Sequence, residues 1–192
     1  MSAVLAGLVA VVATLVVAAQ LSGNDLEVDA TVKLDTPGIY AEPTDVGNRD
    51  VSGTPLPDVT FIDTDGAERS LDEFRGSPLV VNLWYKNCPP CARELVDFAE
   101  VDAELRAADS PVRFIGLNPN DSADTMLAFA GERGVEYELW RDTQRTFGVE
   151  IGVVNYPVTL FVDADGNIVE QVGEINAAGL RDNIATLFGE PA

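Results

Sequence analysis

The feature that most constrains this chain is a Cys-Pro-Pro-Cys motif at 88–91, which holds its only two cysteines. The motif follows an apolar run at 79–84 that has the length and composition of a buried strand. After the motif, apolar residues recur at near-helical spacing from 91 to 107. The cysteines are therefore predicted to lie where a buried strand turns into an amphipathic helix.

This position predicts different chemistry for the two sulfur atoms. At a helix N-terminus, unpaired N–H groups and the helix dipole favour a thiolate, so Cys88 is the predicted nucleophile. Pro89 and Pro90 suit the first helical positions, where a missing N–H costs little, and they stiffen the active-site loop. Cys91 is the predicted resolving thiol, which attacks a mixed disulfide. An inert structural disulfide is the weaker interpretation, because so short a loop constrains the unfolded chain only slightly.

Composition removes several other kinds of site. The chain has no histidine, which excludes histidine catalysis and leaves too few ligands for a usual structural zinc site. We expect no metal and no cofactor beyond the redox-active cysteine pair. A formal net charge of -20 disfavours any nucleic-acid partner. The Asp-x-Asp-Gly sequences at 63–66 and 163–166 lack the closing glutamate of a calcium loop and are predicted to be hairpin turns.

The remaining pattern predicts one α/β domain. Strands are expected in a hairpin that begins with 59–62, and then at 79–84, 112–117, 158–162 and 168–172. Helices are expected at 91–107, 123–133 and 177–188. This order implies a central mixed β-sheet flanked by helices on both faces.

The N-terminal part of the chain is predicted to lie outside this domain. Residues 3–21 are almost wholly apolar and long enough for a transmembrane helix. We expect a membrane anchor or signal segment at 1–22, a flexible tether at 23–52 with room for a short strand at 31–34, and the folded domain at 53–192. A single-pass anchor is preferred over a signal peptide cleaved after Ala19. The acidic start of the tether favours an extracytoplasmic domain.

Residues 80–91 resemble the strand and active site of TlpA/ResA-type thioredoxin-like proteins, a redoxin group related to AhpC/TSA proteins. The resemblance runs from about Gly53 to the C-terminus and includes 57–58, 65–66, 70–76 and 156–157. It implies a thioredoxin fold with an N-terminal hairpin extension. It also implies a membrane-anchored thiol:disulfide oxidoreductase that reduces extracytoplasmic protein disulfides, as in cytochrome c maturation. The expected partners are protein disulfides such as apocytochrome c and a membrane electron donor, and the protein is expected to be a monomer.

The resemblance also implies how a substrate is held. Pro157 is expected to be cis and to present the Tyr156 backbone beside Cys88 for pairing with a substrate. A trans proline at a strand entry is the alternative. Trp84 is a candidate substrate contact, although aromatic residues beside a buried strand usually fill the core.

Two charged residues near the cysteines are candidates for tuning thiol ionisation. Glu94 matches an acidic position of the family, where a partly buried carboxylate would tune the thiols or accept a proton. An exposed acid in the first helical turn is the equal alternative. Asn82 replaces the buried aspartate of ordinary thioredoxins, which favours a role for Glu94. Lys86 is near enough in sequence to stabilise a thiolate.

Two other functions compete with disulfide exchange. A peroxiredoxin-like thiol peroxidase needs a lone reactive cysteine and, three positions before it, a hydroxyl residue that binds the peroxide oxygens. This chain has Tyr85 at that position and a dithiol in place of the lone cysteine. A redox-inert thioredoxin-like domain would use its groove only to bind peptides. The two intact cysteines argue against that interpretation.

Overall fold

Seven strands form the sheet of the described chain, which comprises residues 47–189 of a computed structural model. The strands are β1 (Thr60–Ile62), β2 (Glu68–Ser70), β3 (Leu79–Leu83), β4 (Arg113–Asn118), β5 (Glu138–Arg141), β6 (Val158–Val162) and β7 (Ile168–Val172). The helices are the 3-10 helix η1 (Leu71–Phe74) and the α-helices α2 (Pro89–Ala107), α3 (Ala123–Gly131), α4 (Thr146–Glu150) and α5 (Ala177–Phe188).

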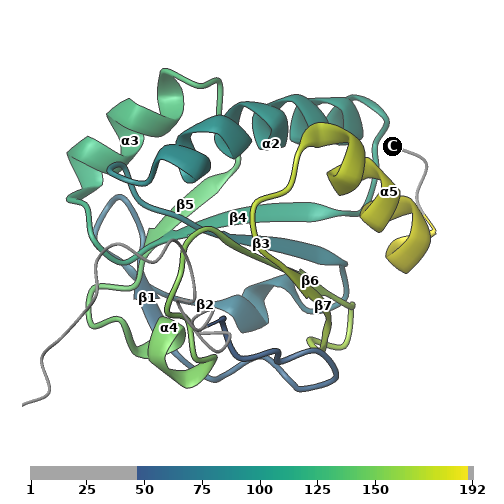
Figure 1. Ribbon diagram of the computed structural model, residues 1–192, viewed down its shortest axis with the longest axis horizontal. Coiled ribbons are helices and arrows are strands. Elements are labelled where there is room, and N and C mark those ends of the chain that lie inside the picture. The colour runs from purple at the N-terminus through teal and green to yellow at the C-terminus, as the bar shows by residue number, and fades with distance from the viewer. Residues whose placement is uncertain (1–46, 190–192) are drawn as a thin grey trace, which may run out of the picture. The chain divides into compact units, whose positions relative to one another are not determined.

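The sheet is mixed, as predicted, with the order β2-β1-β5-β4-β3-β6-β7. Strands β3, β4 and β5 run parallel to one another, and β6 pairs antiparallel with β3. Antiparallel hairpins form the two edges, β1 with β2 and β6 with β7. Strand β3 therefore lies inside the sheet, between β4 and β6, and its C-terminal end leads into the cysteine motif (Figure 1).

Strand β3 divides the core into two layers because successive side chains of a strand point to opposite faces. Leu79, Val81 and Leu83 belong to one buried cluster, whereas Val80 and Trp84 belong to the other. The first cluster is covered by η1 and α4, and the second by α2, α3 and α5. Figure 1 shows α2, α3 and α5 on the same side of the sheet. Burial on both faces explains why the sequence of β3 is a continuous apolar run with one polar residue, Asn82.

The two Asp-x-Asp-Gly sequences are hairpin turns, as predicted. Asp63 Oδ1 accepts hydrogen bonds from the N–H groups of Asp65 and Ala67 at 3.0 and 2.8 Å. Asp163 Oδ1 accepts in the same way from the residues at 165 and 167. Each carboxylate is thus used inside its own turn, which is the usual reason for aspartate at this position.

One strand and one α-helix are additional to those predicted from the sequence. Strand β5 and helix α4 were not expected, because both are short and neither has a clear apolar periodicity. Their positions are fixed by packing: Trp140 of β5 and Phe147 of α4 are buried in the same cluster, where both contact the ring of Phe61. Helix α2 begins at Pro89, so the two prolines occupy its first positions, as predicted.

The N-terminal boundary of the folded chain also differs from the expectation. Residues 47–52 were assigned to the tether, but Val51 is buried in the core and the Arg49 N–H bonds to the Gly152 carbonyl. The predicted membrane segment at 1–22 and most of the tether lie outside the described residues. Within residues 47–189, no helix has the length and apolar character needed to cross a membrane.

Packing beside β3 predicts that Gly116 of β4 does not tolerate a side chain. A Cβ atom there would lie 2.6 Å from Leu139 Cδ2 and 2.9 Å from Trp84 Nε1. We expect Gly116→Ala to lower the free energy of unfolding by about 1–3 kcal/mol, because close-packed cores resist added atoms. Urea denaturation measures this loss.

Gly131→Ala is the matched control, since Gly131 is the last residue of α3 and has nothing within 4 Å of its would-be Cβ. It should be neutral or stabilise the protein by up to about 1 kcal/mol. Equal effects of the two substitutions would contradict the packing argument.

Candidate functional site

The cysteine pair lies at the start of α2, as predicted. Cys88 is the N-cap residue, with extended backbone geometry, and Pro89 and Pro90 occupy the first two helical positions. Because neither proline has an N–H, the first free N–H of the helix is that of Cys91, which donates to Cys88 Sγ at 3.3 Å. The end of the helix thus presents a donor and a positive dipole to this sulfur, and both favour a thiolate.

Cys88 and Cys91 form a disulfide with an S–S distance of 2.03 Å and a Cα–Cα distance of 5.2 Å. Cys88 keeps 3% of its surface exposed, whereas Cys91 has none. An incoming group therefore meets the Cys88 sulfur first. This asymmetry agrees with a nucleophile at 88 and a resolving thiol at 91.

The backbone before Cys88 is fixed from a neighbouring loop. Asp121 Oδ2 accepts a hydrogen bond from the Lys86 N–H at 2.7 Å and another from Asn118 Nδ2 at 2.8 Å. Asn118 ends β4, and parallel neighbouring strands bring their C-terminal ends to the same sheet edge. Asp121 was not singled out from the sequence, although its place just after β4 is a signal that could have identified it.

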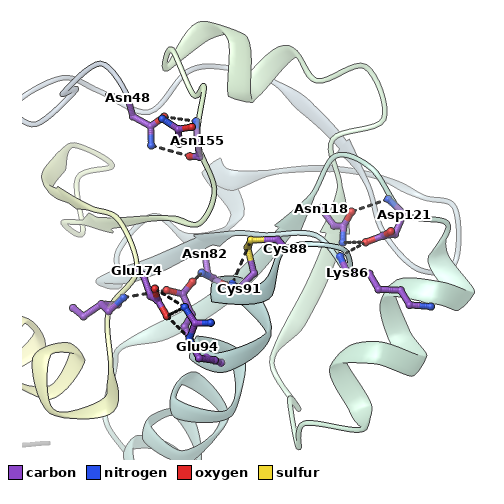
Figure 2. Close-up of a disulfide and its surroundings, with 12 residues drawn as sticks. Asn48, Asn82, Lys86, Cys88, Cys91, Glu94, Asn118, Asp121, Asn155 and Glu174 are labelled. Atoms are coloured by element: carbon purple, nitrogen blue, oxygen red, sulfur yellow. Dashed lines mark hydrogen bonds and ion pairs between the residues drawn. A yellow bond between two sulfur atoms is a disulfide. The ribbon is translucent and has the colours of Figure 1, made fainter. Parts of the chain in front are cut away.

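Lys86 contributes through its backbone in this structure. Figure 2 shows its side chain pointing away from the two sulfur atoms. The expected ammonium beside the Cys88 sulfur is therefore not observed: the Lys86 side chain is exposed, and its N–H bonds to Asp121.

Glu94 is buried, with only 1% of its surface exposed, so it is not the exposed first-turn acid. It lies three residues after Cys91 on α2, a spacing that places two side chains on the same helix face. Its Oε1 accepts a hydrogen bond from Asn82 Nδ2 at 2.5 Å, and its Oε2 accepts one from the Ile175 N–H at 3.2 Å. Figure 2 shows this carboxylate meeting the Asn82 side chain.

Burial raises the pKa of Glu94 to about 8. The hydrogen bonds from Ile175 and Asn82 favour the ionised form and oppose this rise, while the nearby Glu174 and Asp97 carboxylates add to it. The group therefore changes its charge near neutral pH, where a proton donor or acceptor for a thiol is most effective. Desolvation is the largest of these causes.

Asn82 suits both protonation states of Glu94. Its amide nitrogen donates to the carboxylate, and its Oδ1 has no hydrogen-bond partner within the described chain. Since an amide has one donor end and one acceptor end, rotating it by half a turn would let Oδ1 accept from the protonated acid. An aspartate at this position would instead repel the Glu94 carboxylate.

Glu174 and Arg93 connect the loop before α5 to the start of α2. Arg93 Nε and Nη2 donate to the two Glu174 carboxylate oxygens at 2.8 and 3.0 Å. The adjacent residue, Ile175, supplies the N–H that bonds to Glu94. Neither Arg93 nor Glu174 was a candidate from the sequence, because the contact joins residues 81 positions apart.

The three predicted substrate contacts are Trp84, Tyr156 and Pro157, and the structure places them in different surroundings. Trp84 has no exposed surface and stacks on Phe129 at 5.9 Å between ring centroids, so it is a packing residue and not a substrate contact. The Tyr156–Pro157 bond is cis, as expected. The half-buried Tyr156 ring meets the Tyr85 ring edge-on at 5.3 Å, just before the cysteine motif. Among the described residues, no cluster of acidic and cysteine side chains could hold a metal ion.

Comparison of the sequence with models of protein families shows which family the chain belongs to. Residues 52–171, more than half of the chain, match the model of the AhpC/TSA family. The chain belongs to the AhpC/TSA family. Membership confirms the redoxin-type resemblance of the sequence, which began close to the first matched residue.

Curated relatives of this AhpC/TSA protein are named as disulfide-exchange proteins. The chain is 31% identical over 117 residues to thiol:disulfide interchange protein DsbE of Vibrio cholerae, covering 60% of each chain. It is 29% identical to the DsbE of Pseudomonas fluorescens biotype C, over 79% of this chain and 83% of the relative. It is 25% identical to thiol-disulfide oxidoreductase ResA of Halalkalibacterium halodurans, over 69% of this chain and 73% of the relative. These names confirm the expected class, a thioredoxin-like oxidoreductase.

Solved structures confirm the fold. A putative thiol:disulfide interchange protein DsbE from Chlorobium tepidum superposes with a TM-score of 0.63 at 18% identity, covering 73% of this chain and 97% of the other. The thioredoxin-like arrangement of a mixed sheet flanked by helices is therefore shared, although few residues are identical.

The raised pKa of Glu94 predicts a pH-dependent stability. The folded state holds the Glu94 proton up to about pH 8, whereas the unfolded chain loses it near pH 4.5, so the free energy of unfolding should fall as pH rises between these values. The slope is at most about 1.4 kcal/mol per pH unit. Urea denaturation of the oxidised protein at several pH values measures it.

Glu94→Gln should abolish most of this slope, because glutamine does not titrate. Glu100→Gln changes an exposed acid on the same helix and should leave the slope unchanged. A wild-type stability that stays flat from about pH 5 to 8 would show that Glu94 is ionised in the fold.

Proposed function

We propose that this chain is a thiol:disulfide oxidoreductase that reduces the disulfides of other proteins through Cys88 and Cys91. The observation that carries this proposal is the Cys91 N–H aimed at Cys88 Sγ at the start of α2, with Cys91 itself fully buried behind it. This geometry supports a reactive outer sulfur and a protected inner one.

The exchange begins from the reduced dithiol. The Cys88 thiolate attacks one sulfur of a substrate disulfide, forming a mixed disulfide and releasing the other substrate sulfur as a thiolate. Cys91, as a thiolate, then attacks Cys88 Sγ, which expels the second substrate sulfur. Two electrons pass to the substrate, and the Cys88–Cys91 disulfide remains.

Glu94 is proposed to hold the proton that Cys91 must lose before it attacks. The carboxylate lies on the helix face that carries Cys91, and its pKa near 8 makes it able to accept a proton around neutral pH. Asn82 can stay bonded to Glu94 in both states. The site needs no cofactor for this chemistry beyond its own dithiol.

The backbone of Tyr156 and Pro157 is proposed to pair with the substrate chain next to Cys88. Strand β6 begins at Val158, which pairs with Leu83 at the end of β3. Residues 156–157 therefore lie beside the segment that leads from β3 to the cysteines. An extended substrate can pair with backbone at this position regardless of its sequence.

The proposed location, substrates and electron donor of the protein are based on the names of its relatives. Those matched by this chain are named DsbE and ResA, and one solved structure, 21% identical, is that of a secreted Mycobacterium tuberculosis disulfide oxidoreductase. Together with the apolar segment at 3–21, these names support a membrane-anchored protein with its domain outside the cytoplasm, and we propose that it is a monomer. Its proposed substrates are extracytoplasmic proteins such as apocytochrome c, and its proposed electron donor is a membrane protein.

Single cysteine variants test the assigned roles. Cys91→Ser should trap a mixed disulfide with a protein substrate, because no resolving thiol remains, whereas Cys88→Ser should form none and lose all turnover. Non-reducing gels and intact-mass spectra detect the adduct. Trapping through Cys91 in the Cys88→Ser variant would reverse the two roles.

The direction of electron flow is tested by the reduction potential of the Cys88–Cys91 pair. A reductant of this kind is expected to have a potential well below about -200 mV, measured by equilibration with dithiothreitol or glutathione buffers. A value of about -120 mV would instead identify an oxidant.

A further inference from the structure

One side chain near the N-terminus of the described chain holds the loop that precedes Pro157. Asn48 Oδ1 accepts hydrogen bonds from the N–H groups of Val154 and Asn155, both at 2.8 Å, and Asn48 Nδ2 donates to the Asn155 carbonyl at 2.8 Å. Figure 2 shows the two asparagines facing each other. A single amide thus bonds to three backbone groups of the two residues before Tyr156.

The two residues that Asn48 bonds to have no apolar burial of their own. Val154 is 58% exposed, and Asn155 is exposed as well, whereas Val153 and Tyr156 on either side of them pack against the core. The hydrogen bonds from Asn48 therefore hold these two residues in place, because exposed loop backbone is ordered chiefly by its hydrogen bonds. Asn48 lies 107 positions from Asn155 in sequence, so these bonds are tertiary contacts and not part of the local turn.

The residues that follow Asn48 hold it in place by bonding both to the loop and to β7. We call residues 47–51 the N-terminal strap. The Arg49 N–H bonds to the Gly152 carbonyl at 3.3 Å, and Gln171 of β7 donates to the Arg49 carbonyl at 2.9 Å and accepts from the Val51 N–H at 3.3 Å. With Val51 buried in the core, the strap lies firmly between β7 and the loop.

We propose that Asn48 is a positioning residue, which keeps the loop at 152–157 in the conformation that binds the backbone of a protein substrate. The inference rests on the substrate role proposed above for residues 156–157. A loop that is already ordered loses little conformational entropy when a chain pairs with it, so binding is tighter. A small disulfide without a peptide backbone does not use the loop, and its reaction with Cys88 should not depend on Asn48.

The test compares two disulfides in the full chain. Reduced wild type and Asn48→Ala are mixed with insulin, a protein disulfide, and with bis(2-hydroxyethyl) disulfide, a small neutral one, and the reactions are quenched with acid and alkylated for mass analysis. We expect Asn48→Ala to lower the second-order rate constant for insulin by about tenfold. The rate constant for the small disulfide should stay within about twofold, since the Cys88 thiolate is unchanged.

Two further variants separate positioning from stability. Asn48→Asp keeps an oxygen that accepts from the N–H groups of Val154 and Asn155 but loses the donor to the Asn155 carbonyl, so it should recover only part of the insulin rate. Asp63→Ala removes two comparable side-chain-to-backbone bonds, together with an ion pair to Arg69, in the β1–β2 turn. Three strands separate this turn from β6, so the substitution should not alter the ratio of the two rates. Hydrogen exchange should show faster exchange at the amides of 154 and 155 in Asn48→Ala, with β3 unchanged.

The outcomes are distinct. A selective loss with insulin, together with faster exchange at 154 and 155, supports the positioning role. The positioning role is overturned if Asn48→Ala leaves the ratio of the two rate constants unchanged, whether both fall together or neither falls. It is also overturned if Asp63→Ala loses rate selectively with insulin. If the wild type reacts with neither disulfide, the proposed function itself fails, and this result is read before any variant is compared.

Discussion

The burial of β3 on both of its faces is the constraint on which the rest of the structure depends. A strand with partners on both sides and a packed layer above and below has one register, because a shift by one residue would exchange its two sets of side chains. The end of such a strand is a fixed point, and the chain places its cysteines directly after it. The reactive sulfur is thus positioned by the core, while the helix that follows supplies its electrostatics.

The same layer carries the polar groups that surround the inner sulfur. Asn82 occupies the one polar position of β3, on the face that α2 covers, and so meets Glu94 in an otherwise apolar interior. Neither residue would be tolerated there alone, because a buried polar group without a partner is costly. Together with the Ile175 N–H they form a small buried network whose charge depends on a single proton.

The elements that carry this core could be predicted from the sequence, and the contacts between loops could not. The apolar run of β3, the periodicity of α2 and the turn residues at 63–66 are local signals, and the structure confirms all three. Strand β5 and helix α4 depend on aromatic packing by Trp140 and Phe147, which no short window of sequence reveals. Asp121 and Asn48 act through backbone groups of distant residues, and Trp84 looked like a candidate contact only because its burial was unknown.

The attachment of the N-terminal strap also has a mechanical consequence. The strap enters the fold at the loop beside β6, and the chain makes its first bond to β7 backbone only after the strap, at Gly53, which bonds to the Ile168 carbonyl. Tension applied to the chain at residue 47 would therefore bear first on the backbone at 152–155, ahead of any sheet hydrogen bond. The loop proposed to bind protein substrates is therefore also the first part of the domain to bear such tension.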